Sequence, residues 1–172
     1  MELTTPSGVS ASFERHRLSV KGPKGTVERD FSKIPVSVEV KDAKILLSTT
    51  RSRKGDKAIL NTCRSHVGNM FKGVTEGFTY RLKVVFAHFP ITVKVQGSEV
   101  HVENFYGERA PRRATIVSES TKVQVEGDDL VVSGPDLEAV GQTAANIELS
   151  TKVKEKDQRI FLDGVYIYER KK

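Results

Sequence analysis

The chain has 172 residues, of which 37% are hydrophobic and 29% charged, and its formal net charge is +6 at pH 7. No apolar run approaches the roughly 20 residues that cross a bilayer, which excludes an integral membrane protein and indicates a soluble one. The excess of Lys and Arg favours nucleic acid or another polyanion as partner, and a merely solvated basic surface is the plainer alternative.

Two further features narrow the class of protein. Residues 1–10 carry an acid and no apolar core, so they lack the regions of a secretory signal, and we expect a cytoplasmic protein. Cys63 is the only cysteine, which excludes an internal disulfide and a multi-cysteine zinc cluster. A chain of this length can bury one sizeable core or two modest ones.

The first half of the chain predicts strands, a hairpin and then a helix. Apolar and polar residues alternate over residues 18–21, and residues 38–48 form two such strands around a polar turn. Apolar residues recur at helical spacing over residues 58–72, after which Gly73 can serve as a left-handed C-cap. A basic loop precedes this helix and contains Arg51, Arg53, Lys54 and Lys57.

The second half repeats this order. Residues 91–94 match strand 18–21 at an offset of 73, and hairpin 123–133 matches hairpin 38–48 without a gap at an offset of 85. A helix follows over residues 136–149, with Pro135 in the position of a first-turn proline. The two offsets predict about twelve extra residues in the second copy, between Asn104 and Lys122.

The repeat predicts an α+β protein of two tandem copies of a small domain, each an antiparallel sheet packed against one helix. The helix is expected to cover the apolar face, because a short sheet or an isolated amphipathic helix is marginal alone. We place the boundary near Gly77, which gives a first domain over residues 1–77 and a second over residues 78–172. The second domain carries the basic inserted loop and a basic tail.

The titratable residues predict no enzyme. His16, His66, His88 and His101 are dispersed, without the spacing of metal ligands, so we expect no metal, no cofactor and no catalytic residue. Residues 22–25, Gly-Pro-Lys-Gly, look faintly like a phosphate-binding loop, but a strand follows them rather than a helix. A plain turn is the better interpretation.

RNA binding requires cations for phosphates and flat groups for stacking; the inserted loop offers both, and the tail adds further cations. Residues 1–78 hold 14 basic against 8 acidic residues, whereas residues 79–172 hold 14 against 14, with the bases gathered in these two segments. A solvated loop is the alternative. The predicted RNA-binding residues are Tyr106, Arg109, Arg112, Arg113, Lys152, Lys154, Lys156, Arg159, Lys171 and Lys172, with Arg51, Arg53 and Lys54 as secondary contacts.

Two segments carry a family resemblance. Residues 69–78, Asn-Met-Phe-Lys-Gly-Val-Thr-Glu-Gly-Phe, resemble the interdomain junction of large-subunit ribosomal protein six. Residues 156–166, Lys-Asp-Gln-Arg-Ile-Phe-Leu-Asp-Gly-Val-Tyr, look like the carboxyl end of its archaeal and eukaryotic branch, and the compact chain favours the archaeal type. Residues 104–111 depart from the bacterial pattern of Gly-aromatic-Ser-His-Pro, so the contacts of that loop do not transfer.

The resemblance implies a structural constituent of the large ribosomal subunit. It implies contact with large-subunit rRNA near the factor-binding region and the sarcin–ricin loop, mostly through the second domain, as a monomer beside other large-subunit proteins. An RNA-binding maturation or translation factor outside the mature ribosome is the alternative. A small-molecule enzyme is a third possibility, which requires titratable residues that converge in a pocket.

Overall fold

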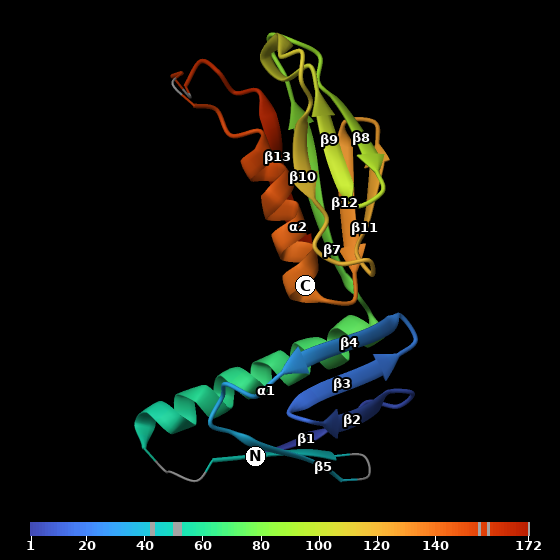
Figure 1. Cartoon of the computed structure of the whole chain (residues 1–172), viewed down its shortest axis with the longest axis vertical. Coiled ribbons are helices and arrows are strands. Elements are labelled where there is room, and N and C mark those ends of the chain that lie inside the picture. Colours follow the sequence, from blue (N-terminus) through green and yellow to red (C-terminus); the bar gives the residue numbers. More distant parts are fainter. Residues whose placement is uncertain (42–43, 50–52, 155, 158, 172) are drawn as a thin grey trace. The chain divides into compact units, whose positions relative to one another are not determined.

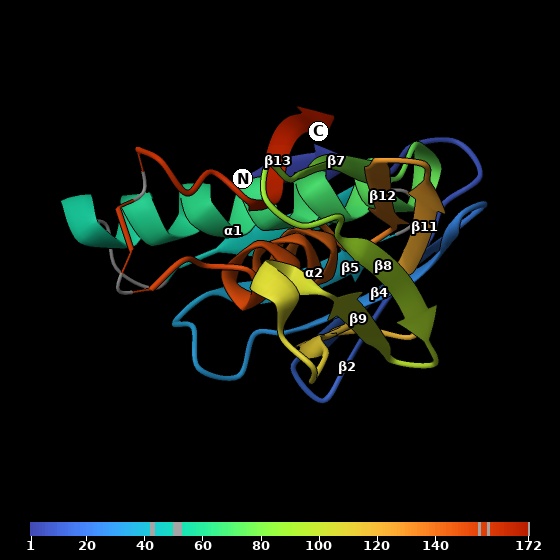
Figure 2. The same cartoon turned by 90° about the horizontal axis from the view of Figure 1, so that it is seen from above.

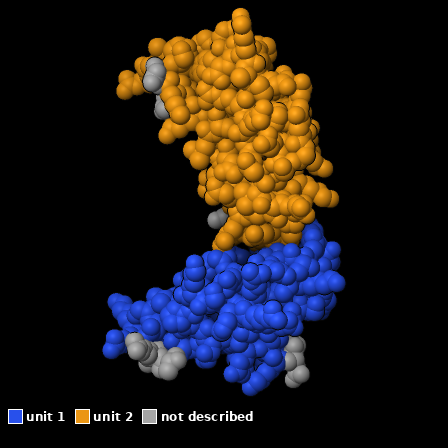
Figure 3. Space-filling model, in the orientation of Figure 1, with its two compact units in different colours: residues 1–77 blue, residues 78–172 orange. Residues whose placement is uncertain are grey.

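The computed structural model describes every residue except 42–43, 50–52, 155, 158 and 172, so Arg51 and Lys172 lie outside the described residues. The chain divides into two compact units, Met1–Gly77 and Phe78–Lys172, coloured blue and orange in Figure 3. Each unit has its own cluster of buried apolar side chains.

Unit 1 contains two antiparallel three-stranded sheets, with strand orders β1-β6-β5 and β2-β3-β4 (Figure 1). Arg15 and His16 form the two-residue turn between β2 and β3, and their φ angles of 47° and 65° are those that a type I′ hairpin demands. The strands are β1 (Glu2–Thr4), β2 (Ser10–Glu14), β3 (Arg17–Gly22), β4 (Gly25–Asp30), β5 (Ser37–Lys41) and β6 (Lys44–Ser48).

The predicted first helix is confirmed as α1 (Lys54–Thr75), which packs against β3, β4 and β6. Its apolar stripe includes Val67 and Val74, both 0% exposed, because residues at helical spacing share one face. The predicted C-cap was wrong. The helix continues through Gly73, which is buried, and the left-handed residue is Gly77, with a φ of 76°.

Unit 2 also contains two antiparallel sheets, ordered β10-β9-β8 and β11-β12-β7-β13. A short 3-10 helix, η1 (Phe105–Gly107), interrupts the connection between β9 and β10. The strands are β7 (Phe78–Val85), β8 (Thr92–Gln96), β9 (Glu99–Glu103), β10 (Arg112–Thr115), β11 (Lys122–Glu126), β12 (Asp129–Gly134) and β13 (Gly164–Lys171).

The predicted second helix is confirmed as α2 (Leu137–Ser150), which packs against β7, β10, β12 and β13. Asp136 is its N-cap, and the carboxylate accepts the Glu138 N–H at 3.0 Å, which satisfies one of the free donors of the first turn. Pro135 therefore precedes the cap and does not lie in the first turn. Neither helix is long and apolar enough, in the described residues, to span a membrane.

The α+β class and the tandem arrangement are confirmed. Each unit, however, divides its strands between two small sheets, where the sequence predicted one sheet per copy. Alternating residues identify a strand and its buried face but do not reveal which strands pair, so the number of sheets was not specified by the pattern.

The hairpin match is confirmed, whereas the earlier strand match was wrong by one strand. β3 and β9 are the central strands of corresponding sheets, and Leu18, Val20, Val100 and Val102 are all 0% exposed. Residues 91–94 overlap β8, which corresponds to β2 and not to β3. The second copy does carry extra residues at this place, but the predicted size of about twelve is wrong: residues 104–111 connect β9 to β10, where only residues 23–24 connect β3 to β4.

Candidate nucleic-acid interface

Three connecting segments of unit 2 meet at one end of its sheets (Figures 1 and 2). They are residues 86–91 after β7, residues 104–111 after β9 and the described residues of 151–163 before β13, and we call them together the loop end. They meet because Gly164, the first residue of β13, pairs with Val85, the last residue of β7. The Asn104 amide also donates to the Pro90 carbonyl at 2.9 Å, which joins the first two segments.

Asp163 joins the first segment to the third. Its carboxylate is 0% exposed and accepts the N–H groups of Ala87 and His88 at 3.1 and 3.2 Å and the His88 Nδ1–H at 3.1 Å. Burial by itself would raise the pKa of the Asp163 carboxyl, but the hydrogen bonds from His88 and Ala87 hold it below the ordinary value. The ionised carboxylate therefore fixes the start of the 86–91 segment.

Aromatic rings gather beside Asp163. The His88 ring stacks on Phe161 with centroids 5.0 Å apart, and Tyr106 meets Phe161 edge-on at 5.8 Å. The Lys156 Nζ lies 4.9 Å from the Phe161 ring centroid and 5.6 Å from that of Tyr106, within the range of cation–π attraction. We call His88, Phe105, Tyr106 and Phe161 the aromatic cluster.

Tyr106 occupies an unusual backbone conformation. Its φ of 52° and ψ of 29° place it in the left-handed region, which a bulky side chain rarely adopts. Asn104, with a φ of 59°, shares this region, where asparagine is better tolerated. Such strain costs on the order of 1–3 kcal/mol and gathers at functional sites, so it supports a functional role for this turn.

Arg112 differs from the other predicted cations because its donors are already used. Nε and Nη2 donate to the two Glu108 carboxylate oxygens at 2.9 and 2.6 Å, and Nη1 donates to the Ser150 carbonyl at 3.0 Å. Its guanidinium also lies 4.4 Å from the Phe105 ring centroid. The hydrogen bonds from Arg112 lower the pKa of the Glu108 carboxyl, and the bond to Ser150 makes Arg112 a link between residues 104–111 and the end of α2.

The remaining predicted cations fall into two groups. Lys171 lies at the opposite end of β13, where it pairs with Thr79, about seven residues or roughly 20 Å along the strand from Gly164. The other predicted cations of unit 2 lie on the segments of the loop end or, for Arg113, in the adjoining strand β10, and all are exposed: Arg109, Arg113, Lys152, Lys154, Lys156 and Arg159.

The secondary contacts predicted in unit 1 lie at the start of α1. Arg53 is the N-cap residue and Lys54 the first helical residue, and both are exposed. Asp56 is the acidic residue of this first turn. Cations at a helix N-terminus oppose the helix dipole, so the start of α1 combines two positive side chains with a positive dipole end.

His88, Phe161 and Asp163 belong to the site but were not predicted from the sequence. One signal was available: residues 86–90 read Phe-Ala-His-Phe-Pro, an aromatic run outside any alternating strand, and Phe86 and Phe89 are each 44% exposed. Asp163 lies in the tail segment that carries the family resemblance, but nothing in that segment indicated its role, because its partners lie about 75 residues away. Within the described residues, no group of three or more His, Cys, Asp or Glu side chains could hold a metal ion.

Comparison with known proteins agrees with this duplicated fold. The family model described as Ribosomal protein L6 matches residues 5–77 and 89–164. The large ribosomal subunit protein uL6 of Sulfurisphaera tokodaii is 46% identical over 170 residues, which cover 98% of this chain and 91% of that protein.

Two other archaeal relatives carry the same name, large ribosomal subunit protein uL6. The protein of Aeropyrum pernix is 48% identical over 166 residues, covering 96% of this chain and 91% of its own. The protein of Methanosarcina mazei is 48% identical over 165 residues, covering 96% and 93%. Because both repeats match the family model and these relatives span nearly the whole chain, the protein belongs to the ribosomal protein L6 family, and the predicted resemblance to its archaeal type is confirmed.

Proposed function

We propose that this chain is a structural constituent of the large ribosomal subunit and binds large-subunit rRNA through the loop end of unit 2. The observation that carries the proposal is that exposed cations lie on the same segments as the aromatic cluster, with Lys156 over two of its rings, which would provide charge for phosphates beside rings for unstacked bases. The names of its relatives, large ribosomal subunit protein uL6, support the same assembly.

The residues of the loop end divide into two roles. Arg109, Arg113, Lys152 and Lys154 are exposed and are proposed to contact phosphates directly. Arg112 and Asp163 are proposed to position the loops that present them, because their polar atoms are engaged within the unit. Lys156 is proposed to do both, since it lies over two rings and remains exposed.

Unit 1 is proposed to make a secondary contact. Arg53 and Lys54 lie at the positive N-terminal end of the α1 dipole, which repels them. A phosphate bound there would be attracted by both the cations and the dipole. The main anchor is proposed to be the domain formed by residues 78–172, although residues 1–78 carry the larger net charge. A phosphate responds to cations within a Debye length of roughly 10 Å and not to the sum over a domain.

The position within the subunit is a finer proposal. The resemblance to large-subunit ribosomal protein six supports contact near the factor-binding region and the sarcin–ricin loop. Chemical footprinting of the rRNA, in subunits assembled with and without this chain, tests the position. Protection of the sarcin–ricin region that appears only with the chain supports it, and protection confined to other regions contradicts it.

Two further proposed properties of the chain are its lack of catalytic activity and its place among the other proteins of the ribosome. The family is one of ribosomal structural proteins, and we propose that this member catalyses no reaction and acts as a monomer in cytoplasmic ribosomes, beside other large-subunit proteins.

Cosedimentation with large subunits through a high-salt wash tests the function itself. A structural constituent remains in the subunit fraction at one copy per particle. Complete loss in the wash favours a maturation or translation factor that binds the ribosome reversibly.

A further inference from the structure

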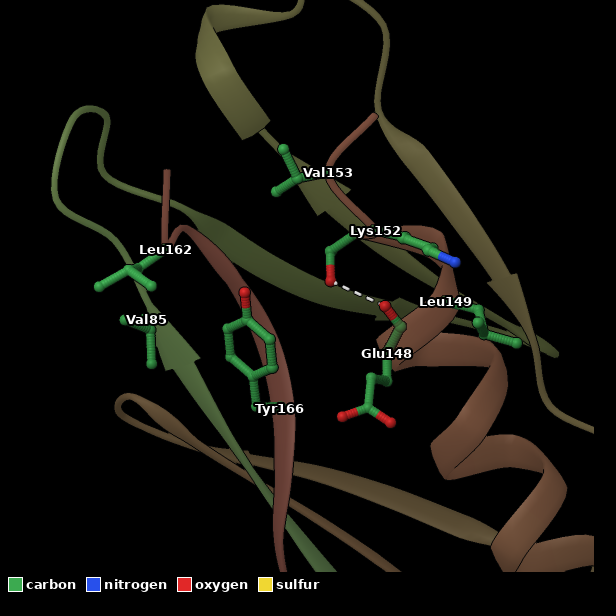
Figure 4. Close-up of a pocket in the computed structure, with 8 residues that line it drawn as sticks. Val85, Glu148, Leu149, Lys152, Val153, Leu162 and Tyr166 are labelled. Carbon is green, nitrogen blue, oxygen red and sulfur yellow. Dashed lines mark hydrogen bonds between the residues drawn. The ribbon is translucent and has the colours of Figure 1, made fainter. Parts of the chain in front are cut away.

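A groove of about 600 Å³ lies in unit 2 between the end of α2 and the start of β13 (Figure 4). Its apolar lining comes from three separate elements: Val85 ends β7, Leu149 is in the last turn of α2, and Leu162 and Tyr166 flank the start of β13. Figure 4 shows the Tyr166 ring alongside β13, with its hydroxyl directed toward the end of the groove where Leu162 lies.

The lining residues are unusually exposed for large apolar side chains. Val85 is 37% exposed, Leu149 61%, Leu162 55% and Tyr166 41%. Single exposed apolar residues need no explanation, but several around one hollow mark a binding surface. RNA is a poor occupant, because most of the lining is apolar and its one cation, Lys152, is accompanied by the carboxylate of Glu148.

The edge of the sheet beside the groove is closed to an added strand. The Val165 N–H donates to the Thr151 hydroxyl at 2.9 Å, and the Ile167 N–H donates to Glu148 Oε1 at 3.1 Å. These two donors of the edge strand β13 are therefore satisfied by the end of α2. An occupant has to bind through its side chains and not by extending the sheet.

The charge of the groove specifies one feature of the occupant. Glu148 Oε2 has no hydrogen-bond partner among the described residues, since only Oε1 accepts from Ile167. Lys152 also lines the groove, but Figure 4 shows its ammonium directed away from the Glu148 carboxylate. A carboxylate with one free oxygen beside apolar walls fits a Lys or Arg of a partner.

We propose that this groove binds an apolar segment of another large-subunit protein, and that a Lys or Arg of that segment pairs with Glu148. The inference rests on the proposed function, because it takes the partner from the same subunit. It places a protein-binding surface beside the proposed RNA contacts, and the two share the 151–163 segment, which contributes Thr151, Lys152, Val153 and Leu162 to the groove.

Photo-crosslinking in assembled subunits tests the partner. A photo-reactive amino acid replaces Leu149 in the full chain, and the matched control replaces Val117, an apolar residue of the same unit that is 51% exposed and outside the groove lining. We expect crosslinks from position 149 to one segment of one large-subunit protein, at least tenfold above the control.

The other outcomes contradict the proposal in distinguishable ways. Crosslinks from position 149 to rRNA, or none above the Val117 control, refute the groove and leave the proposed function intact. A chain that is absent from the subunits refutes the proposed function and, with it, a partner from that subunit.

A synthetic peptide of the crosslinked segment then tests the ion pair. Glu148→Gln removes the charge and keeps Oε1 as the acceptor for Ile167, so the fold is preserved. We expect about tenfold weaker binding to Glu148→Gln, and no further loss when the basic residue of the peptide is also neutralised. If neutralising the basic residue weakens binding to Glu148→Gln as much as it weakens binding to the wild-type chain, Glu148 and that residue do not pair.

Discussion

Arg112 donates two hydrogen bonds to the Glu108 carboxylate, of 2.9 Å from Nε and 2.6 Å from Nη2, while its Nη1 donates to the Ser150 carbonyl. One side chain thus closes the 104–111 loop on itself and attaches it to the last turn of α2. Its neighbour Arg113 is exposed and has no hydrogen-bond or ion-pair partner among the described residues. Two adjacent arginines therefore have different surroundings.

Arg112→Ala is expected to lower the free energy of unfolding by about 1–2 kcal/mol. Charged hydrogen bonds contribute about 1.5–3 kcal/mol, and the estimate is reduced because the Arg112 side chain is 27% exposed. Urea unfolding monitored by circular dichroism measures the change. Arg113→Ala is the matched control and should change stability by less than about 0.5 kcal/mol. Equal losses for both variants would show that the Arg112 contacts do not stabilise the loop.

Asp163 predicts a pH dependence of stability. Its pKa in the folded protein lies below the ordinary value of 3.8, so the unfolded chain binds the proton more readily. The stabilisation is therefore fully present above the ordinary value and is lost as the pH falls through 3.8 toward the folded pKa. Asp163→Asn should cost about 1–3 kcal/mol near pH 7, and progressively less in more acidic solution.

The free energies of unfolding of the wild-type chain and Asp163→Asn, measured between about pH 7 and pH 3, should approach each other as the pH falls. The comparison isolates Asp163, because Glu108, whose pKa is also lowered, is present in both. A difference that stays constant across the range would mean that the Asp163 charge is not the stabilising feature.

The two helices and the hairpins at residues 38–48 and 123–133 could be predicted from the sequence because their signals are local. Hairpin 123–133 pairs as expected, with Val123 opposite Val132 and Val125 opposite Leu130. The strand match of residues 18–21 failed because short alternating strands resemble one another, and only pairing shows that β3 is the centre of its sheet.

The positions of the candidate site residues depend on contacts between distant segments. The sequence places Arg109, Arg112 and Arg113 in one inserted segment and therefore predicts one environment for all three. Arg109 and Arg113 are indeed exposed, whereas the donors of Arg112 are engaged within the unit. The Ser150 carbonyl that accepts from Arg112 lies 38 residues away, and the Asp163 partners lie 75 and 76 residues away. Nothing local in the sequence encodes such pairs, so tertiary packing alone reveals which polar groups are already engaged.

Gly22 is expected to tolerate no side chain. A Cβ there would lie 2.7 Å from Val74 Cγ2 and 2.9 Å from the Val74 carbonyl oxygen, where the next turn closes on the end of α1. Gly22→Ala should destabilise the protein by about 1–3 kcal/mol. Gly68→Ala, in the same unit, is the control: a Cβ at Gly68 meets nothing within 4 Å, and alanine should stabilise the helix interior by about 0.5–1 kcal/mol. Thermal or urea unfolding measures the change in stability, which should be a loss for Gly22→Ala and a gain for Gly68→Ala. An unchanged stability of Gly22→Ala would contradict the close packing.

The final prediction ranks the two units as RNA-binding surfaces. Replacing Arg109 and Arg113 by Ala should weaken binding to large-subunit rRNA more than replacing Arg53 and Lys54, even though residues 1–78 hold the net charge of +6. The first pair is exposed on and beside the 104–111 segment that bears Phe105 and Tyr106, whereas the second pair lies at the N-terminus of α1.

Filter binding over a range of salt concentrations measures the difference. Each lost phosphate contact should reduce the magnitude of the log–log salt slope by about 0.7–0.9, because fewer condensed counterions are released. Circular dichroism of each variant first establishes that it is folded. We expect a slope change of about 1.5 for the unit 2 pair and less than about half of that for the unit 1 pair. The opposite ranking would move the main RNA contact to the start of α1 and leave the loop end as a structural feature of unit 2.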